Sequence, residues 1–338
     1  MPLNSRRATE DRLDRLREEA LRNGRVSETG MPIAGGPIPR HAASVSGYYG
    51  QPIVKPPVWT WQIGLYLFVG GTAGMSAVIA LAGFLTGQPL DFVRAALGVA
   101  LAGALVSPVL LIWDLGRPTR FLNMFRVFKW HSAMSMGVWT LTLFGGFAGA
   151  AFVVVEAWDF LMQLGVPPTG LRGLALVLVA GSALSGVVLA TYTGVLLGAT
   201  AVPVWSAHHK LLPFHFGIVG LGSAAAVLEL LGFRLAALNA IGLTVAAVET
   251  GVGVWIEMGR QSATARAIHH GTPGLLLRAA ALLTGPVSLV LRILGWAPIA
   301  ASGFLIGAVL SRYGWVFAGR VSARDPEETI ASQTLSSF

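Results

Sequence analysis

The stretch AALGVALAGALVSPVLLIWD, residues 95–114, decides the fold class of this protein. Residues 95–113 carry no charge, and the run closes on Asp114. A helix of about 20 apolar residues crosses the roughly 30 Å hydrocarbon core of a bilayer. Within lipid every backbone N–H and C=O must be bonded internally, which a single segment achieves only as a helix. Residues 95–114 therefore predict a membrane-spanning helix that ends at a polar surface.

Similar apolar runs recur along the sequence and predict eight spans. The sequence is 54% hydrophobic and 12% charged, whereas about a quarter of the residues in a soluble domain are charged. The expected fold class is therefore an all-α integral membrane protein. Arg292 and Pro298 interrupt the last two runs. The spans are predicted at residues 58–86, 93–113, 134–155, 173–200, 212–232, 236–256, 274–294 and 296–318.

Polar segments flank the membrane domain. Residues 1–57 form an N-terminal extension, residues 58–320 the eight spans and residues 321–338 a polar C-terminal tail. Within the extension, Thr9 can cap a short amphipathic helix, which a Pro- and Gly-rich tether follows. A disordered tail and an arm that folds on a partner are equal alternatives for this extension.

Lysine and arginine are unevenly distributed between the two sides of the predicted bundle. Eight spans place both termini on one side, and 20 of the 24 Lys and Arg residues fall there. Positive loops mark the cytoplasmic side, so both termini are expected in the cytoplasm. The net charge of +8 is then explained by topology and does not indicate nucleic-acid binding. The residues on the other side are Arg94, Arg172, Arg234 and Arg292.

The two halves of the sequence resemble each other. Residues 74–84 (GMSAVIALAGF) match residues 222–233 (GSAAAVLELLGF), and Asp-Leu-Gly-Arg at 114–117 matches Glu-Met-Gly-Arg at 257–260. The matched order favours two four-helix units related as a parallel repeat over chance similarity in a Gly/Ala/Leu-rich sequence.

The residue types present exclude several resident cofactors. The sequence has no cysteine, so it lacks thiolate ligands for an iron–sulfur cluster or zinc and an attachment point for c-type haem. A b-type haem needs facing histidines deep in the spans, and none of the seven histidines lies there. We expect no metal, haem or iron–sulfur cluster in this protein.

Polar side chains gather at the predicted cytoplasmic ends of the spans. Gln62 and Tyr66, spaced i,i+4, share one helix face. A pocket with a few hydrogen-bond donors and aromatic walls suits a quinone headgroup, which has two carbonyl oxygens and takes up protons on reduction. The gathered residues are Gln62, Tyr66, Asp114, Arg117, His131, Tyr192, Trp205, His208, His209 and His215.

Some of these residues also have a purely structural interpretation. Trp59 and Trp205 are typical of the aromatic belt at a membrane interface. Asp114 is expected to form an ion pair with Arg117 or Arg120, which would fix the helix end and keep the acid charged.

Two acids fall inside spans, Glu229 toward the outer face and Glu249 near mid-membrane. A buried glutamate without a partner holds its proton or pairs elsewhere. Such residues often mark proton or ion pathways, and the alternative is a hydrogen bond to the backbone of a neighbouring helix.

Five segments in order resemble the NrfD/polysulfide reductase membrane-subunit family. The resemblance covers roughly residues 58 to 320. The segments are YLFVGGTAG (66–74), WDLGRPTRFLNMFR (113–126), HSAMSMGVWTL (131–141), YTGVLLGATAVPVW (192–205) and LLPFHFGIVGLGSAAA (211–226).

The resemblance implies an eight-span subunit of a prokaryotic cell membrane without its own redox cofactor. Such a subunit passes electrons between menaquinone or ubiquinone and a four-cluster ferredoxin-like partner, which serves a molybdopterin catalytic subunit. The family's headgroup residues correspond here to Gln62, Tyr66 and Tyr192. Asp114, Arg117 and His131 are then expected to relay protons or support the headgroup residues.

This sequence departs from the family pattern at two places. Residues 132–137 read SAMSMG where members often carry SPMSWG, and span 1 offers Gln and Tyr where others have Asn or His. Two rival functions therefore stay open: a proton- or ion-translocating subunit that uses Glu229 and Glu249, and a plain anchor.

Overall fold

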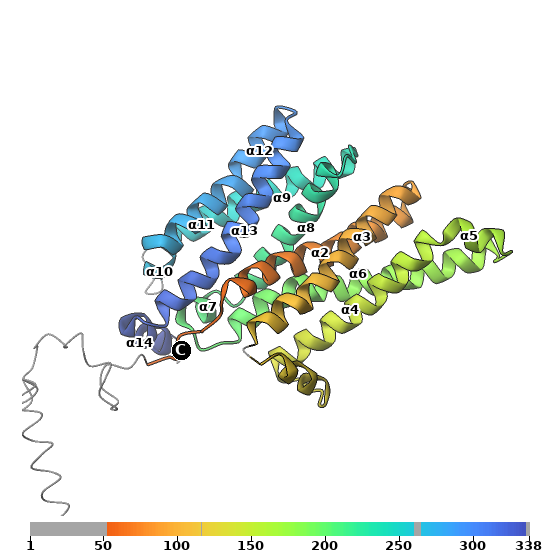
Figure 1. Cartoon of the computed structure of the whole chain (residues 1–338). Helices are drawn as coiled ribbons and strands as arrows, with labels where there is room; N and C mark the ends of the chain where they lie inside the picture. The colour runs from red at the N-terminus through yellow and green to blue at the C-terminus, as the bar shows by residue number, and fades with distance from the viewer. Residues whose placement is uncertain (1–52, 116, 260–264, 336–338) are drawn as a thin grey trace, which may run out of the picture. The chain divides into compact units, whose positions relative to one another are not determined.

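The computed structural model describes residues 53–115, 117–259 and 265–335 (Figure 1). The helix and tether predicted within residues 1–57 lie almost entirely outside this range. The three-part division of the protein therefore stays a prediction.

Eight described helices are long and apolar enough to cross a membrane, and the described residues contain no strand. The all-α, eight-span fold class is confirmed. The spans are α2 (Trp61–Leu85), α3 (Leu90–Asp114), α4 (Ala133–Glu156), α6 (Pro168–Gly198), α8 (Leu211–Leu230), α9 (Ala236–Met258), α11 (Gly271–Thr284) with α12 (Pro286–Ile293), and α13 (Ala297–Ser322).

Short helices connect these spans. They are η2 (Pro118–Phe125), a 3-10 helix, with α5 (Trp158–Gln163), α7 (Pro203–Ala207), α10 (Arg266–His269) and α14 (Pro326–Leu335).

Span 7 is broken, although not where the sequence suggested. Gly285 separates α11 from α12, and Pro286 opens α12. A proline lacks the N–H that a helix interior needs but fits its first turn. For the same reason Pro298 begins α13 without interrupting it, and Arg292 is tolerated inside α12 because it has a buried partner.

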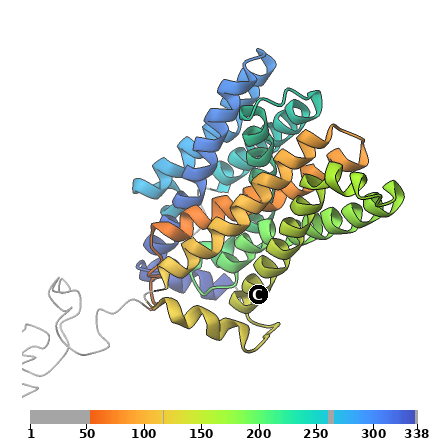
Figure 2. The same cartoon turned by 45° about the vertical axis from the view of Figure 1, so that its right-hand side comes forward.

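Apart from α8, which packs on both groups, the spans fall into two groups that pack mainly among themselves (Figures 1 and 2). The first bundle consists of α2, α3, α4 and α6, and the second of α8, α9, α11–α12 and α13. The helices α2 and α6 of the first bundle pack against α8 of the second, and α2 also contacts α13. This grouping agrees with two four-helix units, while their relation as a parallel repeat stays a prediction.

Candidate functional site

A cavity of about 130 Å³ opens in the first bundle at the end where α3 finishes. A cavity of about 150 Å³ accommodates benzene, so this one has room for about one six-membered ring. All four spans of the bundle and η2 contribute to its wall. The lining residues are Trp59, Ile63, Tyr66, Leu111, Asp114, Leu115, Phe121, Met124, Met134, Gly137, Val138, Tyr192 and Leu196.

Two tyrosines from different helices meet in this pocket. Tyr66 comes from α2 and is 2% exposed, and Tyr192 comes from α6. The Tyr192 hydroxyl donates a 2.6 Å hydrogen bond to the carbonyl oxygen of Ala133, in the first turn of α4. A Cβ on Gly137 would lie 2.3 Å from the Tyr192 oxygen, so the ring can occupy this position only because residue 137 is glycine. The Tyr192 hydroxyl is thereby held at the same end of the bundle as Tyr66.

Asp114 ties the end of α3 to the start of α2. Its Oδ1 accepts a 3.1 Å hydrogen bond from the Thr60 backbone N–H and a second from the Thr60 hydroxyl. Of the two arginines expected to pair with Asp114, Arg117 has an exposed side chain and forms no ion pair with Asp114 in the described part of the chain. The side chain of Arg120 lies outside the described residues.

The structure separates the remaining predicted residues from the pocket. Gln62 is buried, but its side-chain carbonyl contacts the Thr60 hydroxyl and does not line the cavity. His131 is exposed beside Trp130, with their rings 4.7 Å apart. Tyr66, Asp114 and Tyr192 thus come together, whereas Gln62 sits behind Thr60 and both Arg117 and His131 lie on the surface.

Several residues that line the pocket could not be assigned to it from the sequence. Met134 and Gly137 fall in a quoted motif without an assigned role, and Trp59 was interpreted as a belt residue. Trp59 stacks on Trp205 with ring centroids 5.0 Å apart. The belt interpretation is wrong for Trp205, which is fully buried and donates from Nε1 to the Trp315 carbonyl at 2.8 Å.

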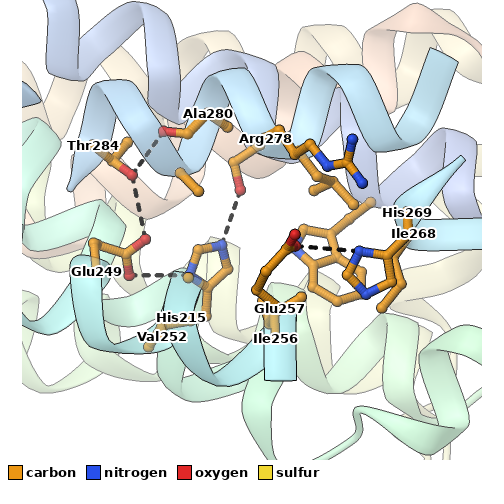
Figure 3. Close-up of a pocket in the computed structure, with 15 residues that line it drawn as sticks. His215, Glu249, Val252, Ile256, Glu257, Ile268, His269, Arg278, Ala280 and Thr284 are labelled. Carbon is orange, nitrogen blue, oxygen red and sulfur yellow. Dashed lines mark hydrogen bonds and ion pairs between the residues drawn. The ribbon is translucent and has the colours of Figure 1, made fainter. Parts of the chain in front are cut away.

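A second polar cluster lies inside the second bundle (Figure 3). His215 Nδ1 lies 3.0 Å from Glu249 Oε1, and His215 Nε2 lies 2.9 Å from the Ser311 hydroxyl. The Thr284 hydroxyl donates to the Ala280 carbonyl at 3.0 Å and lies 3.5 Å from the other Glu249 oxygen. Glu249 therefore bonds to side chains of neighbouring helices instead of their backbone. His215, which the sequence grouped with the quinone residues, belongs to this cluster.

Glu229 also has a partner, at the opposite end of the second bundle. Arg292 donates two 2.8 Å hydrogen bonds to its two carboxylate oxygens and a third, of 3.1 Å, to Asn239. A Cβ on Gly242 would lie 2.0 Å from the Arg292 guanidinium carbon, so this glycine makes room for the arginine. Arg292 is one of the four basic residues assigned to the outer side from the sequence, and its side chain is fully buried.

Residues 51–242 match the sequence model of the family described as "Polysulphide reductase, NrfD". The chain belongs to the NrfD family. Over 101 residues it is also 35% identical to the C subunit of polysulfide reductase from Wolinella succinogenes, and this stretch covers 27% of the present sequence and 29% of that protein. The predicted family resemblance is thus confirmed. The NrfD match contains Tyr66, Asp114 and Tyr192, whereas Glu249 and the last two spans lie beyond it.

Membership of the NrfD family and the eight apolar helices of the described residues indicate a multi-pass membrane protein. Within the described residues no three His, Asp or Glu side chains group closely enough to hold a metal ion. Its lining residues provide the pocket with hydroxyl and carboxylate groups and an aromatic wall.

Proposed function

We propose that this protein binds quinone and passes electrons between the membrane quinone pool and an iron–sulfur partner subunit. The observation that carries the proposal is the ring-sized cavity that Tyr66, Tyr192 and Asp114 line together. The partner would serve a molybdopterin catalytic subunit, as the family resemblance implies. The quinone is an exchangeable substrate, menaquinone or ubiquinone.

The polar groups of the pocket match what a quinone headgroup requires. A buried ligand carbonyl needs a hydrogen-bond donor. The Tyr66 hydroxyl can supply one, whereas the Tyr192 hydroxyl must turn away from the Ala133 carbonyl to supply a second. Reduction of a quinone by two electrons also consumes two protons. Asp114 lies half-buried at the end of α3, so it is placed to exchange protons between the cavity and water. Gln62 contacts the same Thr60 hydroxyl and would position Thr60 and Asp114.

The surface beside the pocket suits a docked partner. The connection between α3 and α4 exposes Arg117, Arg126 and Lys129 together with large apolar side chains. Basic residues around an apolar patch favour an acidic partner with its own apolar contact area. The exposed apolar residues are Leu122, Val127, Phe128 and Trp130.

The start of α2 and the end of α13 lie on the same side of the eight spans as this surface. The proposed setting is a prokaryotic cell membrane with both termini, the α3–α4 connection and the partner in the cytoplasm, because lysine and arginine concentrate there.

A direct test measures quinone binding by the purified protein. Short-tail menaquinone and ubiquinone analogues are titrated into detergent-solubilised protein by calorimetry. We expect Tyr192→Phe to weaken binding by about tenfold, the effect of losing one buried hydrogen bond worth roughly 1.4 kcal/mol.

Tyr313→Phe is the matched control. Tyr313 also donates to a backbone carbonyl, that of Trp61 at 2.9 Å, but it does not line the cavity. Equal affinities for wild type, Tyr192→Phe and Tyr313→Phe would remove Tyr192 from the site.

A further inference from the structure

A series of polar side chains, buried except for Glu257, runs along the second bundle from one end to the other. They come from three of its four spans and from α10. Ionisable groups inside a membrane are costly and rarely serve packing alone. In order along the bundle, these residues are Glu257, His269, His215, Glu249, Thr284, Ser288, Arg292 and Glu229.

The inner half of this series surrounds a cavity of about 50 Å³ (Figure 3). One water needs about 10–15 Å³ of such space, so a few waters fit. His215 and Glu249 line the deep end, and Glu257 and His269 line the other. Glu257 is 44% exposed, and its carboxylate lies 3.4 Å from His269 Nδ1. Solvent at this end of the bundle is therefore connected to Glu249 through titratable groups and space for water.

The central pair is enclosed. Glu249 is 2% exposed and His215 is 6% exposed. Arg312, 1% exposed, lies over the Phe216 ring and donates to the Phe216 carbonyl at 3.0 Å. A carboxylate and an imidazole in hydrogen-bond contact can exchange a proton without leaving an isolated charge. The charged or titratable groups facing this pair and its cavity are Arg312 of α13, Arg278 of α11, Glu257 of α9, His269 of α10 and, beside His269, His208 after α7.

The outer half follows one side of span 7. Thr284, Ser288 and Arg292 are spaced by four residues and are all nearly fully buried. The Thr284 hydroxyl lies 3.5 Å from Glu249 of α9. Arg292 packs on Gly242, which also belongs to α9. Between them, the Ser288 hydroxyl has no hydrogen-bond partner among the described residues. A buried polar group in this position calls for a water or a moving partner.

The Arg292–Glu229 pair closes the far end of the series. Beyond it, a recess at the opposite end of the bundle is lined by Glu229, Arg234 and Asn239. A buried guanidinium repels a proton that approaches from Ser288. The pair therefore separates the outer recess from the central pair as long as it stays intact.

We propose that the second bundle carries a proton route, separate from the quinone pocket. The Glu249–His215 pair takes up a proton from the inner end through the water-sized cavity. The proton then moves along Thr284 and Ser288 and leaves when the Arg292–Glu229 ion pair opens. Each step breaks one O–H or N–H bond and forms another, with no change in oxidation state. The route goes beyond the proposed function and does not depend on quinone binding.

The first test asks whether Glu249 exchanges protons with water. Infrared difference spectra of the purified full-length protein are recorded between acidic and alkaline pH, in H₂O and ²H₂O. We expect a protonated-carboxyl C=O band that appears on acidification, shifts in ²H₂O and is lost in Glu249→Gln. Glu156→Gln, which changes an exposed acid at the end of α4, should keep the band. A spectrum without a Glu249-dependent band, or a band insensitive to ²H₂O, overturns the proposal.

The second test removes the Arg292–Glu229 ion pair at the outer end of the proton route. The full-length protein is reconstituted into vesicles that enclose a pH-sensitive dye, and a potassium diffusion potential drives protons inward. Arg292→Gln removes the cation and leaves Glu229 free to become neutral by taking a proton. We expect proton influx severalfold above wild type in Arg292→Gln and a return to the wild-type rate in Arg292→Gln/Glu249→Gln.

Arg94→Gln is the matched control, because Arg94 also pairs with acids at the outer end but belongs to the first bundle. The route is contradicted if proton influx in Arg292→Gln is no faster than in Arg94→Gln. It is also contradicted if the faster influx persists in Arg292→Gln/Glu249→Gln. If Arg292→Gln does not yield monodisperse protein, the infrared result decides the proposal.

Discussion

The Tyr192 hydroxyl and the Ala133 carbonyl oxygen are 2.6 Å apart, joining α6 to the first turn of α4. This bond fixes the position of one phenol at the wall of the cavity. It is possible because Gly137, one turn into α4, leaves the ring its space. The pocket therefore depends on the absence of a side chain at residue 137 as much as on the side chains that line it.

Gly137→Ala is expected to damage the pocket without adding a polar group. The new Cβ would overlap the Tyr192 ring, and overpacking of this kind costs about 1–3 kcal/mol. We expect a lower thermal unfolding temperature in detergent and a loss of quinone-analogue binding. Gly146→Ala is the control, since a Cβ there meets nothing within 4 Å; equal behaviour of the two variants would show that the ring has room to move.

Asp114→Leu tests the link between α2 and α3. The substitution removes the acceptor for both Thr60 hydrogen bonds, and bonds to a charged group contribute about 1.5–3 kcal/mol. We expect Asp114→Leu to be less stable than wild type by at least about 1.5 kcal/mol, and Asp114→Asn to recover part of this loss because its carbonyl still accepts. Thermal unfolding measures both. If Asp114→Leu matched wild type, the Thr60 bonds would contribute nothing to stability.

Glu229→Gln should destabilise the protein strongly. Removing one member of a buried ion pair leaves the other charge uncompensated, at a cost of about 3–5 kcal/mol. Replacing both members, in Glu229→Leu/Arg292→Leu, is expected to cost less than Glu229→Gln alone, because no buried charge remains. Unfolding in detergent provides the comparison, and a double variant less stable than the single one would contradict the buried-pair account.

Glu328 predicts a pH-dependent stability. Burial in α14 raises the pKa of its carboxyl above the ordinary value, so the folded state disfavours the carboxylate. The resulting cost is present above the raised pKa and disappears as the pH falls below the ordinary range of a glutamate. Glu328→Gln keeps an acceptor for the Ala267 N–H, which the carboxylate binds at 3.0 Å.

We therefore expect Glu328→Gln to unfold at a higher temperature than wild type at about pH 8, with the difference vanishing near about pH 4. Glu327→Gln, at an exposed neighbouring position, should show neither effect. A difference that is constant with pH would mean that charge burial is not its cause.

The spans could be predicted from the sequence because each membrane-crossing helix requires a continuous run of apolar residues. A run such as residues 95–113 must become a helix whatever surrounds it. The break in span 7 was misplaced, because the effect of a proline depends on whether it falls within a continuous apolar run, as at Pro286, or in the first turn of a span, as at Pro298.

The partners of polar residues required the structure. Tyr66, Asp114 and Tyr192 were expected together, and they meet. Glu249 and His215 lie on different helices, so no spacing within the sequence could pair them. Asp114 was expected to pair with Arg117 or Arg120, and no pattern in the sequence pointed to Thr60, which binds it across 54 positions.

The central claim is that this protein connects quinone to an iron–sulfur partner, and purification of the intact complex tests it most directly. The tagged full-length protein is isolated from membranes in mild detergent, and the co-purifying proteins and extracted lipids are identified by mass spectrometry. We predict that the wild-type protein is recovered with an iron–sulfur protein and quinone. The Tyr192→Phe variant should lose the quinone and keep the iron–sulfur protein. Recovery of the wild-type protein with neither quinone nor an iron–sulfur protein would contradict the account.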